Sequence, residues 1–527
     1  MQLNLEWGYM SKLKLFLLLQ FIFFSVLPVL AQVDTAWIRR YNGPWNDYDY
    51  ASAVAVDPLG NVYVTGYSWG SGTAYDYATI KYAPNGDTLW VRLYNGPRND
   101  HDYANALTLD SAGNVYVTGR SEGSGTYYDY ATIKHAPNGD TLWVRRYNAP
   151  GDNRDEARAI AVDKSGNVYV TGAANGYFAT IKYAPNGDTL WVRLETGFTG
   201  GGGGANDLAV DEVGNVHVTG WVSPRSYIED YVTIKYSPNG ETLWSNHYDG
   251  TGFYSKDRAN ALAVDYSGNV YVTGQSQGSG TSYDYATIKY APNGNALWVR
   301  RYNGSGNYDD RAFALELDSV GNVYVTGQSQ GSGTYYDYTT IKYAPNGDTL
   351  WVRRYDGPGN YDDRAYALAL DSAGNVYVTG LSEGNGTDYD YATVKYSPTG
   401  DTLWVRRYNG PGKSDDRANA LALDSDANVY VTGQSVGSGT YYDYATIKYV
   451  QFTCVDTAGD ANGDGSHNVP DIIFKVNYVF EGGPKPNPSC RGDDNGDTKV
   501  NIFDIVYEVN YLFKGGSAPL KSRECCK

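Results

Sequence analysis

Cysteine, histidine, methionine and basic charge are scarce in this sequence. Its 527 residues include 4 Cys, all after residue 450, together with 5 His and 2 Met. The histidines are scattered and lack the spacing of a His-Glu-x-x-His metal site, and no catalytic residues are predicted. The 42 Lys and Arg are outnumbered by 59 Asp and Glu, so the net charge is -17. A nucleic-acid partner is not expected, because surfaces that bind nucleic acids are basic.

Long hydrophobic runs are missing except near the N-terminus. Lys12 and Lys14 precede an apolar run over residues 15–30, and Ala31 ends a small-residue cleavage motif. This pattern predicts an export signal over residues 1–31, with Met10 as an alternative start. An uncleaved anchor is the alternative, although the run is slightly short for a membrane span. The mature chain is therefore expected to be secreted or held at a bacterial cell surface, without a transmembrane segment.

An internal repeat dominates the rest of the chain. A Trp recurs at residues 37, 90, 143, 191, 244, 298, 351 and 404, so eight copies of one unit run from about residue 34 to 451. Each copy has four β-rich runs separated by turn residues; in one copy they are 259–265, 269–274, 285–290 and 297–302. A repeated four-stranded meander of this length predicts an all-β fold, an eight-bladed β-propeller over residues 32–452.

The ends of the repeat predict how the ring closes. The chain enters the repeat at a fourth strand, 35–41, and leaves it after a third strand, 444–449. The N-terminal strand should therefore complete the last blade and remove exposed sheet edges. Small residues such as Ala259, Ala261 and Ala263 suit an innermost strand, and the repeated Trp suits the wide outer rim. A solenoid is the alternative, but it needs capping repeats, and none is visible.

The repeated motifs resemble a known family. Ala-Leu-Ala-Val-Asp, Gly-Asn-Val-Tyr-Val-Thr-Gly and Tyr-Ala-Thr-Ile-Lys-Tyr resemble the SBBP bacterial β-propeller repeats over about four-fifths of the chain. The family name implies seven blades, whereas this sequence contains eight copies. Membership implies the fold and says little about function.

One face of such a propeller should carry the long loops. These loops are rich in Tyr, Asp, Asn and Gly, which suits carbohydrate or peptide recognition. The alternative is that the Tyr pack between blades and the Asp support turns. An Asp precedes most inner strands and could form an acidic ring at the channel mouth, although Asp–Arg pairs linking adjacent blades are the favoured interpretation. Asymmetry is expected in the third and fourth copies, where the loop 173–176 is short and 200–204 is polyglycine.

The composition changes after residue 452, where two calcium-binding loops of twelve residues are predicted. Oxygen ligands recur at positions 1, 3, 5, 7, 9 and 12 of each loop, as a hard cation requires, and Gly465 allows the sharp turn of the first. Each loop is followed by a short apolar helix that ends at Gly-Gly. The predicted ligands of the two calcium ions are Asp460, Asn462, Asp464, Ser466, Asn468 and Asp471, and then Asp493, Asn495, Asp497, Lys499 (through its carbonyl), Asn501 and Asp504.

The duplicated loop and helix resemble a type I dockerin, an EF-hand-like α-helical domain, over residues 453–520, followed by a tail over 521–527. The resemblance implies docking to a cohesin module in a polysaccharide-degrading assembly. Loop positions 10 and 11 are apolar here instead of small and polar, so an unusual partner or docking on the propeller is equally open. These candidate partner-reading residues are Val469, Pro470, Ile502 and Phe503. Cys454 and Cys490 could form a disulfide, whereas the state of Cys525 and Cys526 is open.

Together these features predict a secreted, non-catalytic binding or scaffold protein. The propeller would recognise protein or carbohydrate, and the C-terminal domain would dock to a cohesin-like partner or surface component when calcium is bound. Two alternatives stay open: an enzyme component that degrades polysaccharides, such as a glycoside hydrolase or lyase, and a purely structural cell-surface protein.

Overall fold

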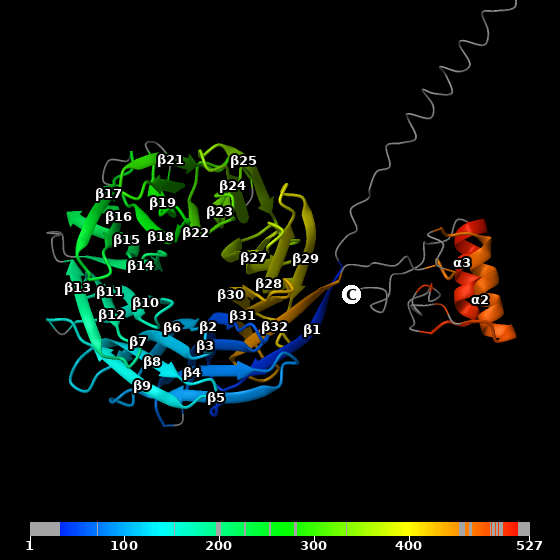
Figure 1. The fold of residues 1–527 in the computed structure, drawn as a ribbon, viewed down its shortest axis with the longest axis horizontal. Coiled ribbons are helices and arrows are strands. Elements are labelled where there is room, and N and C mark those ends of the chain that lie inside the picture. Colours follow the sequence, from blue (N-terminus) through cyan, green and yellow to red (C-terminus); the bar gives the residue numbers. More distant parts are fainter. Residues whose placement is uncertain are drawn as a thin grey trace, which may run out of the picture. The chain divides into compact units, whose positions relative to one another are not determined.

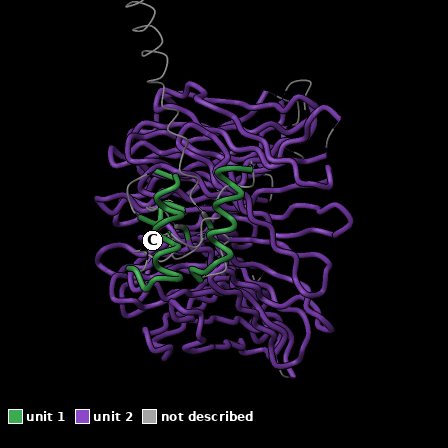
Figure 2. Tube along the Cα trace, turned by 90° about the vertical axis from the view of Figure 1, so that its right-hand side faces the viewer, with its two compact units in different colours: residues 1–33, 451–527 green, residues 34–450 purple. Residues whose placement is uncertain are grey.

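The structure, a computed structural model, describes residues 32–70, 72–151, 153–195, 202–225, 228–251, 255–278, 282–333, 335–452, 459–462, 466–484, 486, 491, 494 and 499–514. The chain divides into two compact units, one of residues 34–450 and one of residues 1–33 with 451–527 (Figure 2). The predicted export signal over 1–31 and the tail over 521–527 lie outside the described residues.

The first unit is an eight-bladed β-propeller of four-stranded antiparallel sheets, as predicted (Figure 1). Blades 1 to 4 are β2–β5 (Asp49–Val56, Val62–Trp69, Tyr75–Tyr82, Thr88–Tyr94), β6–β9 (Asp102–Leu109, Val115–Glu122, Tyr128–His135, Thr141–Tyr147), β10–β13 (Asp155–Val162, Val168–Ala174, Tyr177–Tyr183, Thr189–Glu195) and β14–β17 (Gly203–Val210, Val216–Arg225, Ile228–Tyr236, Thr242–Tyr248). Blades 5 to 8 are β18–β21 (Arg258–Val264, Val270–Gln277, Tyr283–Tyr290, Ala296–Tyr302), β22–β25 (Asp310–Leu317, Val323–Gln330, Tyr336–Tyr343, Thr349–Tyr355), β26–β29 (Asp363–Leu370, Val376–Gly384, Thr387–Tyr396, Thr402–Tyr408) and β30–β32 (Asp416–Leu423, Val429–Val436, Tyr442–Phe452) with β1 (Gln32–Tyr41).

The predicted order of strands within a blade is confirmed. The first strand of each blade lies nearest the axis, and the fourth forms the rim (Figure 1). Inner-strand alanines such as Ala51 and Ala259 are fully buried, since only a small side chain fits where blades converge. The rim Trp residues fill the wider gap between blades: Trp90 is 8% exposed and its indole N–H donates to the carbonyl of Pro137 in the next blade, at 3.1 Å.

Buried tyrosines also join neighbouring blades. The hydroxyl of Tyr77 donates to the backbone carbonyl of Ala131 in the following blade, at 3.2 Å. Tyr130, Tyr231, Tyr285, Tyr338, Tyr391 and Tyr444 make the same bond to their own neighbours. The interpretation that many Tyr residues pack between blades is confirmed for this position. Phe178 stands there in blade 3 and has no hydroxyl to donate.

The ring closes where it was predicted to close. β1 lies beside β32 and completes the sheet of β30 and β31. The guanidinium of Arg40 on β1 donates to Asp443, at 2.8 Å, and to Ser435 and its carbonyl, each at 2.6 Å. On the neighbouring side, the amide of Asn419 donates to the carbonyl of Ala51 in blade 1, at 2.8 Å. The first and last segments of the propeller are thus tied into one blade.

Two helices are described in the second unit, both where the sequence predicts them. They are α2 (Val469–Glu481) and α3 (Ile502–Lys514), and they pack against each other. α2 ends at Gly482, whose φ of 71° is a left-handed conformation that favours glycine. The Gly-Gly pair after α3 lies outside the described residues. Within the described part of the chain, no helix combines the length and apolarity needed to cross a membrane.

Candidate functional site

The long loops of the propeller share one face and are held by buried aspartates. Asp49 is fully buried and accepts a hydrogen bond from the N–H of Gly43, at 2.6 Å. Asp310 accepts the equivalent bond from Gly304, also at 2.6 Å, and is equally buried. These carboxylates fix the loop between the rim strand of one blade and the inner strand of the next. They are structural supports for the face, and the alternative of an exposed acidic ring at the channel mouth is wrong.

The arginines that follow these aspartates have a different partner from the one the sequence suggested. Arg364 pairs with Asp362, at 2.8 Å, and not with the adjacent Asp363. Arg311 with Asp309 and Arg417 with Asp415 repeat this arrangement, at 2.8 and 3.1 Å. Residues i and i+2 point to the same side of an extended chain, whereas neighbours point to opposite sides. In these three blades the predicted inter-blade Asp–Arg link is therefore replaced by a pair within one loop, whereas Arg258 of blade 5 pairs with Glu229 of blade 4, at 2.7 Å.

Blades 1 and 2 carry aromatic rings at the positions of these ion pairs. Tyr48 and Tyr50 occupy them in blade 1, with planes 7° apart and centroids 6.1 Å apart. His101 and Tyr103 occupy them in blade 2, 16° and 5.8 Å apart. Together with Tyr67 and Tyr75 these residues form what we call the aromatic patch. Blade-to-blade comparison of these two positions could have found it, but the sequence prediction placed the asymmetry in blades 3 and 4.

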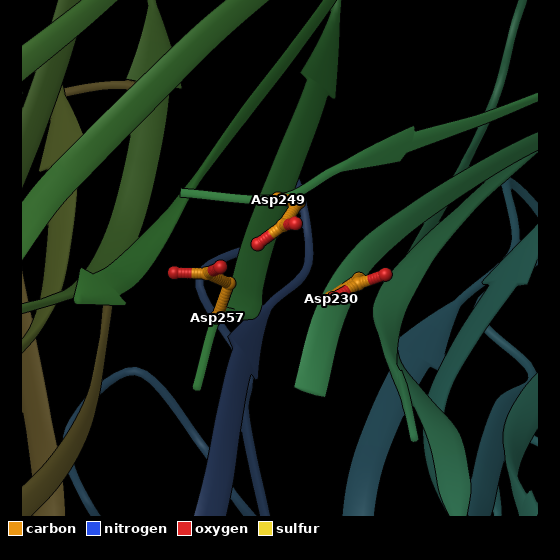
Figure 3. A group of neighbouring side chains, drawn as sticks. All are labelled: Asp230, Asp249 and Asp257. Carbon is orange, nitrogen blue, oxygen red and sulfur yellow. The ribbon is translucent and has the colours of Figure 1, made fainter. Parts of the chain in front are cut away.

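Blade 4 contributes a group of carboxylates on the same face. Oxygens of Asp230, Asp249 and Asp257 lie within 4.8 Å of one another (Figure 3). Burial, together with the charges of Asp249 and Asp257, raises the pKa of Asp230 to about 6. His247 occupies the position in the repeat at which blade 5 has Arg301. In blade 5 this arginine pairs with Asp284, at 2.7 Å. Carboxylate oxygens suit a divalent cation, and this group lacks the arginine that blades 2, 5, 6, 7 and 8 supply.

A similar group of carboxylates in blade 6, completed by Asp363 at the start of blade 7, shows how these two places differ. Asp337, Asp356 and Asp363 also lie within 4.8 Å of one another, but Arg354 pairs with Asp337, at 2.5 Å. Both groups contain an Asp, 249 or 356, where other blades have an Asn such as Asn42. This replacement of Asn by Asp is visible in the sequence and indicates the carboxylate groups. A search for His-based metal ligands did not find it.

Buried carboxylates make the stability of the propeller depend on pH. Burial raises the pKa of Asp49, Asp310 and Asp416 to about 6 and that of Asp363 to about 7. Because the folded-state pKa exceeds the ordinary value, the folded state binds more protons than the unfolded state between about pH 4 and 7. Their contribution is therefore lost as pH rises through this window.

We expect the urea midpoint of the propeller to be higher at pH 5.5 than at pH 8. Asp110 acts in the opposite sense: although burial raises its pKa, hydrogen bonds from Asn114 and Tyr116 lower it overall, so it titrates below this window. Asp310→Asn should reduce the pH dependence, since it removes one of the raised groups. A midpoint that is equal at both pH values, or lower at pH 5.5, would contradict the prediction.

In the second unit the described calcium-loop residues are held in two similar arrangements. Asp471 is fully buried at the start of α2, and its carboxylate accepts hydrogen bonds from the N–H groups of Asn462 and Asn468, at 3.1 and 2.9 Å. Asp504 is equally buried at the start of α3 and accepts from Asp494 and Asn501, at 2.9 and 2.8 Å. Asp460, Ser466 and Lys499 are also described. Asp464, Asp493, Asn495, Asp497 and all four Cys lie outside the described residues.

The side chains between α2 and α3 are largely charged, which sequence reasoning missed. Lys475, Asp494 and Glu508 are fully buried, and the Lys475 ammonium lies 2.5 Å from Asp494 and 2.6 Å from Glu508. Burial raises the pKa of Glu508 above its usual range. The position of Lys475 four residues after Asp471 does mark it as sharing the inner face of α2.

Apolar side chains lie on the outside of this pair of helices instead. Val469 and Phe503, two of the candidate partner-reading residues, are 47% and 68% exposed. The other exposed positions recur at the same places in both helices: Ile473, Phe480, Ile502, Val506 and Phe513, together with Pro470. Exposed apolar residues repeated in this way are typical of an interaction surface.

Comparisons with known proteins agree with the fold of the first unit. The β-propeller repeat SBBP matches residues 36–72, 89–125, 142–178, 251–280, 350–387 and 403–439. An uncharacterized WD repeat-containing protein of Acanthamoeba polyphaga mimivirus is 24% identical over 436 residues, which cover 67% of this chain and 31% of that protein. The chain thus spans about a third of the length of the curated relative it matches.

Solved structures with a similar arrangement are distant in sequence. A Lactobacillus plantarum protein is 13% identical, with a TM-score of 0.41, over 66% of this chain and 99% of its own. A protein of unknown function from Bacteroides caccae is 16% identical, with a TM-score of 0.32, over 55% and 93%. Eight sheets and their closure by β1 identify the first unit as an eight-bladed β-propeller, and six stretches of it match the SBBP β-propeller repeat.

Proposed function

We propose that this protein is an exported, non-catalytic scaffold that binds partners through two separate surfaces. The propeller face would recognise protein or carbohydrate, and the C-terminal helices would dock to a cohesin-like protein or surface component. The observation that carries the proposal is the exposed apolar surface repeated on α2 and α3. A soluble pair of helices exposes Phe503 and Phe513 at a cost unless a partner covers them.

Two calcium ions fit the C-terminal loops. The predicted donors are carbonyl, amide, hydroxyl and carboxylate oxygens, the ligands that calcium prefers. Asp471 and Asp504 are fully buried, and a buried carboxylate needs a cation or several hydrogen bonds to compensate its charge. When bound, calcium would supply the positive charge that neutralises these carboxylates and would fix the ends of α2 and α3. The docking surface would therefore depend on calcium.

A binding experiment tests this proposal. The full mature chain should capture one or more purified modules from a cohesin panel in 1 mM calcium and lose them in excess EGTA. Phe503→Asp should weaken capture by roughly 10-fold or more, because a central apolar contact is replaced by a charge. Lys514→Ala, at the exposed end of α3, is the matched control and should leave capture unchanged.

Calcium binding has its own readout in the same samples. Calcium at about 100 times its Kd should stabilise the C-terminal unit by roughly 2.7 kcal/mol through mass action, seen as an upward shift of its calorimetric transition. Absence of any calcium-dependent shift would contradict the metal assignment. Release of oligosaccharides from polysaccharides incubated with the protein would favour an enzyme component instead.

A further inference from the structure

The loop-bearing face of the propeller is not uniform, although its blades are near copies. Two loop positions, separated by one residue, hold Asp and Arg in blades 6, 7 and 8 and hold aromatic residues in blades 1 and 2. The buried Asp between them is kept in all five blades, so the backbone at these positions is shared. The exchange of Asp and Arg for aromatic residues therefore changes the side chains that the face presents to a ligand, while the backbone of the face stays the same.

The aromatic patch is continuous across the boundary between blades 1 and 2. Tyr67 lies 5.0 Å from Tyr50 in its own blade and 4.8 Å from Tyr103 in the next, between ring centroids. Tyr75 lies 5.6 Å from His101 and 5.5 Å from Tyr103. All of these rings are half-buried, so each is held in place by its neighbours and still reaches solvent.

The two arginines beside the patch are paired with acids. Arg120 lies over the ring of Tyr103, at 4.3 Å, and forms an ion pair with Glu156. Arg98 pairs with Glu122, at 2.9 Å. Burial raises the pKa of Tyr67 to about 12, so its hydroxyl is uncharged at neutral pH. The patch thus offers ring faces and neutral hydroxyl groups beside these ion pairs and the carboxylate of Asp47, whose charge acts on Tyr75.

This chemistry fits a neutral polysaccharide. The electron-rich face of a Tyr ring attracts the polarised C–H groups on the face of a pyranose. Sugar hydroxyls can bond to the phenol groups, can accept hydrogen bonds from the paired Arg side chains and can donate to the paired Glu side chains. An anionic chain is disfavoured because the protein carries a net charge of -17. A peptide would leave the repeated, nearly parallel ring pairs of blades 1 and 2 unexplained.

We propose that the aromatic patch binds a neutral polysaccharide chain by stacking sugar rings on Tyr48–Tyr50 and His101–Tyr103, one pair in each of two adjacent blades. This inference rests on the proposed binding role of the propeller and names its ligand class. The equivalent loops of blades 6, 7 and 8 carry Asp–Arg pairs and take no part in binding.

Affinity electrophoresis tests the proposal on the full mature chain. The probes are two neutral polysaccharides, hydroxyethylcellulose and glucomannan, and one anionic chain, polygalacturonate. At least one of the two neutral probes should retard the wild type. Retardation by polygalacturonate alone is not expected. Tyr48→Asp, Tyr50→Arg, His101→Asp and Tyr103→Arg in one variant should bind about 10-fold more weakly or worse. These are the residues that blade 7 carries at the same positions, so the fold tolerates them.

The matched control changes the same positions in blade 7. Asp362→Ala with Arg364→Ala should leave retardation by the neutral probes unchanged. The inference is overturned if the wild type is retarded by neither neutral probe, if only polygalacturonate retards it, or if the aromatic variant binds as well as the wild type. Capture of a cohesin module, measured on the same preparations, reports separately on the proposed function, so the two can fail independently.

Discussion

Deletion of β1, residues 32–41, should abolish cooperative unfolding of the propeller or lower its midpoint drastically. The deletion exposes the edge of β32 and removes Trp37, whose ring is 7% exposed and whose N–H donates to Pro84 at 3.0 Å. Loss of one buried Trp alone costs about 3–5 kcal/mol, against a total stability of about 5–15 kcal/mol for a typical domain. Arg40 and its bonds to Asp443 and Ser435 are lost as well. The measurement is urea unfolding followed by tryptophan fluorescence.

Hydrogen exchange and a matched substitution locate the effect at the closure. Amides of β32 should exchange rapidly in the deletion variant, since their partners on β1 are gone. Arg354→Leu removes the equivalent arginine from blade 6, where the chain is continuous, and should cost less than Arg40→Leu, which loosens the one blade shared by both ends. Protected β32 amides together with a wild-type midpoint in the deletion variant would show that β1 does not close the ring.

The sequence was sufficient to predict the propeller because the same strand pattern recurs in eight copies. The period-two alanines and the rim Trp residues mark inner and outer strands in each copy, so chance similarity at one place carries little weight. The missing first three strands at one end and the missing fourth at the other then predict the closure. The register could not be predicted in the same way: bulges such as that between Ala51 and Ala53 depend on how the inner strand twists.

The candidate sites were harder to predict because they depend on which side chains turn toward each other. The sequence shows Asp beside Arg at 363 and 364, but the loop path buries Asp363 and pairs Arg364 with Asp362. The rings of Tyr67 and Tyr103 are 36 residues apart in sequence and meet only after adjacent blades pack. The helices of the C-terminal unit followed from their apolar spacing, but that spacing does not show which of the apolar side chains, such as Ile473 and Val506, stay exposed.

Lys475→Met should destabilise the C-terminal unit by about 3–5 kcal/mol, because it leaves two buried carboxylates, Asp494 and Glu508, without their cation. The loss is large for a unit whose described interior is mostly charged and which has little apolar area to offset it. The calorimetric transition of this unit, followed at saturating calcium, should move to much lower temperature or disappear. The propeller transition should not move.

A compensated variant separates the lost ion pair from lost packing. Lys475→Met combined with Asp494→Leu and Glu508→Leu removes every member of the buried group, and such replacements by apolar residues are often neutral or stabilising. The triple variant should therefore regain most of the stability that the single variant loses, whereas Lys514→Met at the exposed end of α3 should change nothing. If Lys475→Met had the same transition temperature as the wild type, the charges of Asp494 and Glu508 would be neutralised by a group other than Lys475. Calcium bound near Asp504 would then be the first candidate.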